Sequence, residues 1–444
     1  MRIVIAGAGE VGSHLAKLLS NEEQDIVVVD NDAQKLGVLD SNYNLMTYVG
    51  SPVSFNTLSE AGAKNADLFI AVTPFEDKNV TSCAIAHSLG AKRSVARIDN
   101  YEFMDPSHKD FFSSIGVSDL IYPEYLAAKE IITALKRGWV RNWFELNNGE
   151  IILIGVKVRD DAYLVGKQLK EITMTHHDLH VSAIKRRRDT IIPRGDDVIE
   201  PNDILYITTT PDKVEDIRKL CNKQNYKVKK VMIMGGGRIT VRLAAMAQND
   251  WKIKILESDI ERCRRLPELC PECEIINADG RDTDVLEEEG IAEMDAFIAL
   301  TDSSETNILT CMTAKEYGVR KTIAEVESIQ LIYQAEGLNI GTIINKKLLA
   351  SSSIFQILLD LDTETSKFLS LAGAEVAELE VKEGCKISRK PVKDLKLSRD
   401  MTIGGLVRNG KGMLVTGNTV FEPGDKVVVF CLSGQIHKIE KLFN

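Results

Sequence analysis

The chain has 444 residues, 55 of them Lys or Arg and 65 Asp or Glu, so its formal net charge is −10. This acidic balance disfavours a general nucleic-acid binder, and no apolar run approaches the ~18 residues that a membrane span needs. The residues after Met1 enter a strand pattern at once and eight cysteines are scattered, so we expect a cytoplasmic chain with no secretory signal and no disulfide framework.

The first part of the chain alternates short apolar strands with helical patterns. Strands are expected at residues 3–6, 25–30, 46–50, 68–73 and 94–98, with helices at 11–19 and 79–89. This alternation implies right-handed crossovers and a doubly wound parallel sheet. The following segment differs, because expected strands at 150–158, 181–184 and 204–208 are separated by turns rich in Asp, Asn, Pro and Gly. That pattern predicts a small α+β domain.

The second half of the chain repeats the first. Asp67–Thr73 matches Asp295–Thr301 at an offset of 228 residues, and the turn Glu200–Asp203 matches Glu422–Asp425 at an offset of 222. The strands of the second parallel sheet are expected at 231–234, 253–256, 274–277, 296–301 and 322–326. The predicted fold class is therefore α/β, with two tandem units, each a Rossmann-like parallel sheet followed by a small α+β domain.

Four modules replace the three or so domains that the length alone suggests, at about 150 residues per domain. The expected boundaries are 1–140, 141–223, 228–360 and 368–444. Apolar helical stretches at 125–135 and 348–359 stand at the two junctions. They are interpreted as crossover or dimerising helices, or as helices packed on their own domain.

A glycine-rich turn follows the first strand. Gly7, Gly9 and Gly12 form a GxGxxG pattern between a strand and a helix, and Asp30 ends the next strand. The first glycine permits a tight turn, the second lets the backbone approach a pyrophosphate, and the third lets helix and strand pack closely. Asp30 can accept a hydrogen bond from a ribose 2′-OH and would repel a 2′-phosphate. This context favours a bound nucleotide over a Rossmann-like domain without one. It favours NAD or NADH, or an adenosine nucleotide, as that ligand.

The second copy of this turn is incomplete. Gly235, Gly236 and Gly237 keep the phosphate-facing glycines, whereas Thr240 replaces the last glycine, which we expect to loosen the packing of helix on strand. Glu257 stands at the end of the second strand. Neither copy has GxxxxGK[ST], so a hydrolytic P-loop is not supported.

Three other clusters are weaker candidates. Cys270-x-x-Cys273 has metal-like spacing but no second CxxC, and His176, His177 and His180 lie in a loop-like stretch. The basic run 185–188 is interpreted as a solvated hairpin turn, with contact to acidic protein or lipid headgroups as the alternative. No nucleophile–base–acid set is recognisable, so we expect neither a catalytic nor a metal site.

These motifs together resemble the RCK (regulator of potassium conductance) family. The resemblance rests on the glycine turn, on Thr73-x5-Asn79, on Val95–Ile98 and on the tandem arrangement, which is typical of the peripheral subunits of bacterial Trk potassium-uptake systems. It implies a homo-oligomer, a dimer or a tetrameric ring, on the cytoplasmic face of the inner membrane. The nucleotide, NAD or NADH with ATP or ADP as alternatives, would be a ligand that biases the ring, and the partner would be a membrane-embedded potassium transporter subunit.

The resemblance also implies which residues hold the nucleotide. Glycine-turn residues would cradle phosphates, the acid would hold the adenine ribose, and Arg97 would reach a phosphate. The positions are Gly7, Ala8, Gly9, Glu10, Val11, Asp30, Thr73, Pro74 and Arg97 in the first copy and Gly235, Gly236, Gly237, Arg238, Ile239, Glu257 and Asp279 in the second.

The two sites should not be equivalent. Glu325 stands where the first copy has Arg97, and a carboxylate facing phosphates is unfavourable. In return, Ser51-Pro52 replaces the Asp279-Gly280 of the second copy. An NAD-dependent dehydrogenase with two Rossmann domains and a purely structural scaffold are the competing functions.

Overall fold

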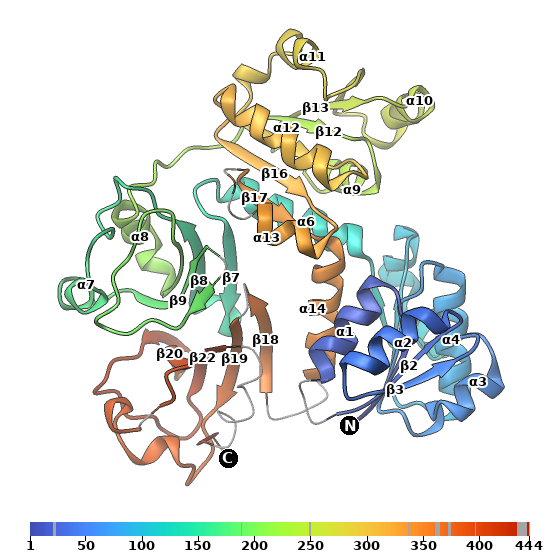
Figure 1. Cartoon of the computed structure of the whole chain (residues 1–444), viewed down its shortest axis with the longest axis horizontal. Helices are drawn as coiled ribbons and strands as arrows, with labels where there is room; N and C mark the ends of the chain where they lie inside the picture. Colours follow the sequence, from blue (N-terminus) through green and yellow to red (C-terminus); the bar gives the residue numbers. More distant parts are fainter. Residues whose placement is uncertain are drawn as a thin grey trace. The chain divides into compact units, whose positions relative to one another are not determined.

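The computed structural model describes residues 1–20, 24–187, 189–247, 250–335, 338, 340–359, 365–371, 374–395, 397–432 and 442–443. They form two compact units (Figure 1): Met1–Ala127 with Asn345–Leu361, and Ala128–Ile344 with Asp362–Asn444. Each unit therefore contains a segment from the other half of the chain. Within the described residues, no helix combines the length and the apolar character needed to cross a membrane.

The first parallel sheet has six strands in the order β3-β2-β1-β4-β5-β6. Its strands are β1 Arg2–Ala6, β2 Asp25–Asp30, β3 Met46–Val49, β4 Leu68–Ala71, β5 Ser94–Arg97 and β6 Asp119–Ile121. Its helices are α1 Glu10–Ser20, α2 Ala33–Asn42, α3 Phe55–Glu60, α4 Glu76–Leu89 and α5 Lys109–Ser114. This is the Rossmann order, and it confirms the predicted fold class.

The second parallel sheet repeats this order as β14-β13-β12-β15-β16-β17. Its strands are β12 Lys230–Met234, β13 Lys252–Glu257, β14 Glu274–Asn277, β15 Ala296–Ala299, β16 Lys321–Glu325 and β17 Thr342–Ile344. Its helices are α9 Arg238–Met246, α10 Ile260–Leu269, α11 Thr283–Glu288, α12 Ser304–Glu316 and α13 Ile329–Ala335. The central strands β4 and β15 are buried at all four positions, as apolar runs covered on both faces must be.

The two small domains carry antiparallel sheets of the same plan. The first sheet contains β7 Asn142–Leu146, β8 Ile151–Lys157, β9 His180–Arg186, β10 Asp189–Ile191 and β11 Ile204–Thr209, with helices α7 Leu169–Thr175 and α8 Val214–Leu220. The second contains β18 Thr365–Leu371, β19 Ala374–Glu380, β20 Met401–Arg408, β21 Lys411–Leu414 and β22 Lys426–Leu432. Inward side chains of both sheets, among them Leu153, Val376 and Phe430, form one apolar cluster.

An arginine holds the acidic turn in each small domain. Arg186 donates two hydrogen bonds to the buried carboxylate of Asp203, at 3.0 and 2.8 Å, and Arg408 does the same to Asp425 at 2.8 and 2.7 Å. The interpretation of residues 185–188 as a solvated hairpin turn is confirmed for Arg187, which is exposed in the turn after β9, and wrong for Lys185 and Arg186. Lys185 and Arg186 belong to β9, and Lys185 is 4% exposed. Arg188 lies outside the described residues.

The junction helices are α6 Pro123–Lys136 and α14 Lys346–Leu359. Helix α14 follows the second parallel sheet in sequence, yet it packs against α1 and β6 of the first (Figure 1). Helix α6 begins in the first unit, and its residues from Ala128 onward belong to the second. Of the two interpretations, the crossover helix is therefore the one confirmed for α14.

Candidate nucleotide-binding sites

The first glycine turn lies at the carboxyl end of β1. Gly7 has φ +115°, and a Cβ at this position would stand 3.0 Å from the backbone nitrogen of Thr73. A Cβ at Gly12 would stand 1.8 Å from the carbonyl oxygen of Gly7, so that only glycine fits this close approach of helix and strand. A Cβ at Gly9 would meet no atom within 4 Å. The open side of Gly9 is where a phosphate could approach the backbone.

The carboxylate of Asp30 organises this turn. One oxygen accepts a hydrogen bond from the backbone nitrogen of Ala8 at 2.6 Å, and the other accepts from that of Asp32 at 2.9 Å. A carboxylate offers about four acceptor positions, so Asp30 retains capacity for a ribose hydroxyl. Asp32 in turn caps α2, accepting from Gln34 and Lys35.

Asn79 ties together the ends of two neighbouring strands. Its side-chain oxygen accepts from the nitrogen and the hydroxyl of Thr73, and its amide donates to the carbonyls of Thr73 and Arg97. Asn307 makes the same four contacts to Thr301 and Glu325. In the sequence, this asparagine was used only for the repeat and for the family resemblance; its equal spacing after Thr73 and Thr301 was the signal for a structural role at the site.

The other predicted residues of the first site differ in how far their side chains are available to a ligand. The side chain of Arg97 is 20% exposed, its guanidinium lies 3.4 Å from Asp99, and its buried Nε has no hydrogen-bond partner among the described residues. The hydroxyl of Thr73 is engaged by Asn79, and Pro74 is exposed. The side chain of Val11 is buried, so that only its backbone is available to a ligand. Arg97 is therefore the side chain with donors to spare for an anion.

Glu10, the first residue of α1, connects the glycine turn to the crossover helix. Its carboxylate forms an ion pair at 2.5 Å with Lys347 in the first turn of α14. Helices α1 and α14 are also in direct contact along their length. A change at the glycine turn is thus adjacent to a segment that connects the second parallel sheet to the second small domain.

In the second copy, Glu257 occupies the position of Asp30. Its carboxylate oxygens accept hydrogen bonds from the backbone nitrogens of Gly236 at 2.7 Å and Asp259 at 2.8 Å, and the residue is 4% exposed. The guanidinium of Arg262 forms an ion pair with the carboxylate of Glu257 at 3.2 Å. Asn277 donates to the backbone carbonyl of Glu257 at 2.9 Å. Sequence reasoning missed Arg262, although it lies one helical turn after the capping Asp259.

These residues border a cavity of about 410 Å³, a volume within the range of small-molecule sites. Its lining includes the predicted Gly235, Gly237, Glu257 and Asp279, together with residues 300–303 after β15. Asp279 is paired with Arg281 at 2.6 Å, and this contact lowers the pKa of its carboxyl. Arg238 is exposed, whereas the side chain of Ile239 is buried away from the cavity.

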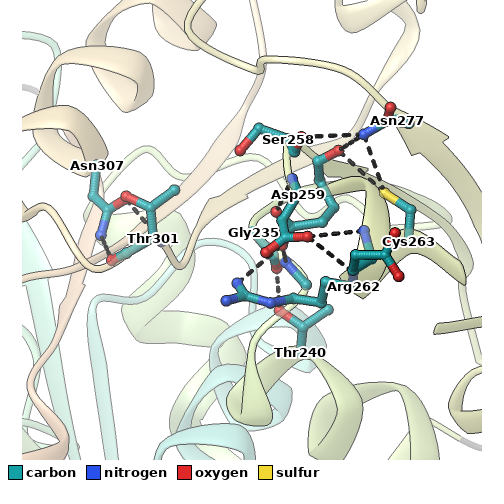
Figure 2. A network of polar contacts seen from close by, with 12 residues as sticks. Gly235, Thr240, Ser258, Asp259, Arg262, Cys263, Asn277, Thr301 and Asn307 are labelled. Carbon is teal, nitrogen blue, oxygen red and sulfur yellow. Dashed lines mark hydrogen bonds and ion pairs between the residues drawn. The ribbon is translucent and has the colours of Figure 1, made fainter. Parts of the chain in front are cut away.

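Thr240 is better accommodated than the sequence suggested. Its side chain is fully buried, and its hydroxyl donates to the carbonyl of Gly235 at 2.5 Å (Figure 2). The same carbonyl position in the first copy is the one that Gly12 approaches. A hydrogen bond therefore takes the place of close backbone packing, and the sequence did not predict this compensation.

Among the described residues, the cysteine and histidine clusters do not have the geometry of a metal site. Within the described residues, no group of three or more His, Cys, Asp or Glu side chains is arranged to hold a metal ion. Cys270 and Cys273 are free thiols at the end of α10. His176 and His177 follow α7, and His180 opens β9.

The chain is similar to known proteins over its whole length. A family model described as TrkA-N domain matches residues 3–123 and 231–346, and one described as TrkA-C domain matches residues 153–222 and 376–444. The Trk system potassium uptake protein TrkA of Halomonas elongata is 30% identical over 450 residues, covering 100% of this chain and 98% of that protein. A TrkA homolog of Archaeoglobus fulgidus is 29% identical over 445 residues, covering 100% of both.

Solved structures with the same fold include the GsuK RCK domain, with a TM-score of 0.60 at 15% identity, covering 100% of this chain and 94% of that one. The GsuK channel bound to NAD also gives a TM-score of 0.60 at 15% identity, covering 100% and 78%. At this identity the likeness concerns the fold. The names are those of potassium-uptake proteins and RCK domains, not of enzymes.

Proposed function

The chain belongs to the TrkA family, and we propose that it is the nucleotide-binding regulatory subunit of a membrane potassium-uptake transporter. In this role it associates from the cytoplasm with the inner face of the membrane, as a dimer or a tetrameric ring. Relatives that match its full length are named as Trk system potassium uptake proteins, which supports this role over a dehydrogenase. The transporter itself is a separate, membrane-embedded chain.

The proposed ligand is NAD or NADH at the first site, with ATP or ADP as competitors. The residues present suit an adenine nucleotide, because the face of Gly9 is open, Asp30 has acceptor capacity, and the buried Nε of Arg97 has no partner among the described residues. The GsuK channel, which shares the fold, has been solved with NAD bound. When bound, the nucleotide supplies a pyrophosphate and a ribose as binding groups, and no reaction is assigned to it.

One observation carries the regulatory mechanism: the ion pair between Glu10 and Lys347. A pyrophosphate at the start of α1 would bring negative charge next to Glu10 and weaken the attraction that holds this carboxylate in place. The phosphates would then attract the ammonium group of Lys347. Because a ligand shifts an equilibrium only by its differential affinity for two states, this contact is where nucleotide binding would favour one position of α14.

The second site is proposed to bind nucleotide more weakly. Glu325 there is buried where the first copy has Arg97, so a cation is exchanged for a carboxylate. Arg262 and Arg281 line the cavity, and their positive charges would offset part of this loss.

The test is calorimetric titration of NADH, NAD, ATP and ADP into the wild-type protein and into Gly9→Asp and Gly237→Asp variants. We expect Gly9→Asp to abolish the tighter of two binding events. Potassium uptake by cells that lack the endogenous protein should become insensitive to nucleotide in the same variant. Absence of saturable binding by wild type at sub-millimolar nucleotide would refute the ligand, and unchanged uptake on deletion of the chain would refute the transport role.

A further inference from the structure

A second large cavity lies in the second unit, at the edge of the parallel sheet opposite the candidate nucleotide site. Its volume is about 680 Å³, and it is bounded by the beginnings of β16 and β17, the segment after α6, the end of β8 and the residues after α8. Strand β16 has five residues, so its two ends are separated by about 13 Å. No described residue lines both this cavity and the 410 Å³ cavity.

The lining of this cavity is strongly basic. It contains seven cationic side chains, namely Arg141, Lys157, Arg159, Lys223, Lys315, Arg320 and Lys321. Its carboxylates are Asp160 and Asp161, so the formal charge of the lining is 7 − 2 = +5. Asp161 accepts a hydrogen bond from Asn222 at 2.9 Å.

Six of these seven cations form no ion pair within the part of the chain that the structure describes. They are Lys157, Arg159, Lys223, Lys315, Arg320 and Lys321. The ammonium of Lys321, which is 4% exposed, donates to the carbonyl of Val140 at 2.9 Å. That of Lys315 donates to the carbonyl of Val319 at 3.1 Å. Carbonyl dipoles thus balance only part of the charge.

Burial and mutual repulsion act on the same lysines. Burial, reinforced by Lys315 and Arg141, lowers the pKa of Lys321 to about 7, although Glu130 opposes the shift. Burial, together with Arg159 and Arg141, lowers the pKa of Lys315 to about 8. Collecting like charges around the buried ammonium group of Lys321 is unfavourable unless an anion compensates them.

Thr342 provides an independent indication of a ligand. It lines the cavity, is 4% exposed, and has a buried hydroxyl without a hydrogen-bond partner among the described residues. A buried hydroxyl left unsatisfied costs about 1–3 kcal/mol, so such groups usually have a partner. An anionic oxygen in the cavity would accept from it.

We propose that this basic cavity binds a small, multiply charged phosphate compound, of the class of inorganic or nucleoside polyphosphates. Lys and Arg side chains with a hydroxyl donor are the usual ligands of phosphate oxygens, and the volume suits a molecule of that size. The site is separate from both glycine turns. It joins residues of β8 in the first small domain to residues of β16 in the second parallel sheet, and a bound anion stabilises their association.

The experiment uses the full-length chain carrying Gly9→Asp and Gly237→Asp, so that neither glycine turn admits a phosphate. Tripolyphosphate and ATP are titrated separately by calorimetry. We expect one saturable binding event per chain. Adding Lys157→Gln and Lys223→Gln should lower the affinity at least tenfold, with the thermal unfolding midpoint unchanged. Tighter binding of ATP assigns the site to nucleotides, and tighter binding of tripolyphosphate assigns it to inorganic polyphosphate.

The matched control adds Lys219→Gln and Lys386→Gln, which change the net charge equally but lie outside the cavity. This control should bind like its parent. An equal loss of affinity in the control would reduce the effect to general charge attraction and overturn the proposal. Absence of saturable binding of both probes to the parent would overturn it as well, without bearing on the nucleotide sites, which the parent already lacks.

Discussion

Substitutions at Gly9 and Gly12 should separate ligand binding from folding at the first site. A Cβ at Gly12 would stand 1.8 Å from the carbonyl oxygen of Gly7, whereas ordinary contact begins near 3.4 Å, so the backbone must retreat by about 1.6 Å. A backbone clash this severe lies at the upper end of the overpacking range, about 3 kcal/mol, and the better helix propensity of Ala returns about 1 kcal/mol, which leaves a loss of about 2 kcal/mol. We expect Gly12→Ala to lower the unfolding midpoint of this unit by roughly 4–8 °C.

Gly9→Asp should reduce nucleotide affinity and leave the stability of the fold unchanged. Its Cβ meets no atom within 4 Å, so folding is unaffected, but its carboxylate occupies the approach of the pyrophosphate. We expect at least a hundredfold loss of nucleotide affinity, about 2.8 kcal/mol.

Thermal unfolding and calorimetric titration of both variants measure the two effects separately. Gly237→Asp serves as control, because it should leave the tighter binding event intact. Wild-type stability of Gly12→Ala, or wild-type affinity of Gly9→Asp, would refute the roles assigned to these glycines.

Four further predictions concern residues around the sites. In a protein whose other glycine turn is blocked, Arg97→Gln should weaken nucleotide binding about tenfold, because one charge-assisted contact is removed. Glu325→Gln should not weaken nucleotide binding at the second site. Equal losses of affinity by calorimetry would contradict the proposed difference between the two sites. Asn79→Ala should destabilise the first unit by about 3 kcal/mol in thermal unfolding, because four buried hydrogen bonds are lost. Thr240→Gly restores the last glycine of the GxGxxG pattern, yet it should destabilise the second parallel sheet by about 1–2 kcal/mol, because the hydrogen bond to Gly235 is lost. A higher thermal unfolding midpoint of this variant would disprove the prediction. Burial lowers the pKa of His180 to about 4, so the unfolded chain binds the extra proton between pH 6.5 and 4. Stability should be complete above pH 6.5 and fall by about 2 kcal/mol by pH 5, and His180→Gln should flatten this loss in pH-dependent unfolding.

The sequence predicted those strands whose burial shows in the pattern of apolar residues within the strand itself. Strands β1 and β4 are continuous apolar runs, and their burial on both faces follows from that composition. Strands β6 and β17 were not expected, because each has three residues at a sheet edge and carries too little pattern. The repeat nevertheless predicted two sheets of one topology.

The sequence predicted those parts of the candidate sites where the backbone conformation requires a particular residue type. Gly7 and Gly12 are required by a positive φ and by a close approach, and both are visible as a glycine pattern. The hydrogen bond of Thr240 and the ion pair of Arg262 depend on how loops lie against each other, which no spacing rule encodes. The basic cavity was missed for the same reason, since its cations are far apart in sequence.

The crossover helix makes the two halves of the chain mutually dependent during folding. A chain ending near residue 223 would contain α1 without α14, the helix that packs against α1 in the intact protein. Each half synthesised alone should therefore aggregate or pair with a second copy, whereas the two halves produced together should complement each other in trans. Fusion of the halves supplies the missing helix at a high effective concentration, so folding of the first sheet no longer depends on protein concentration.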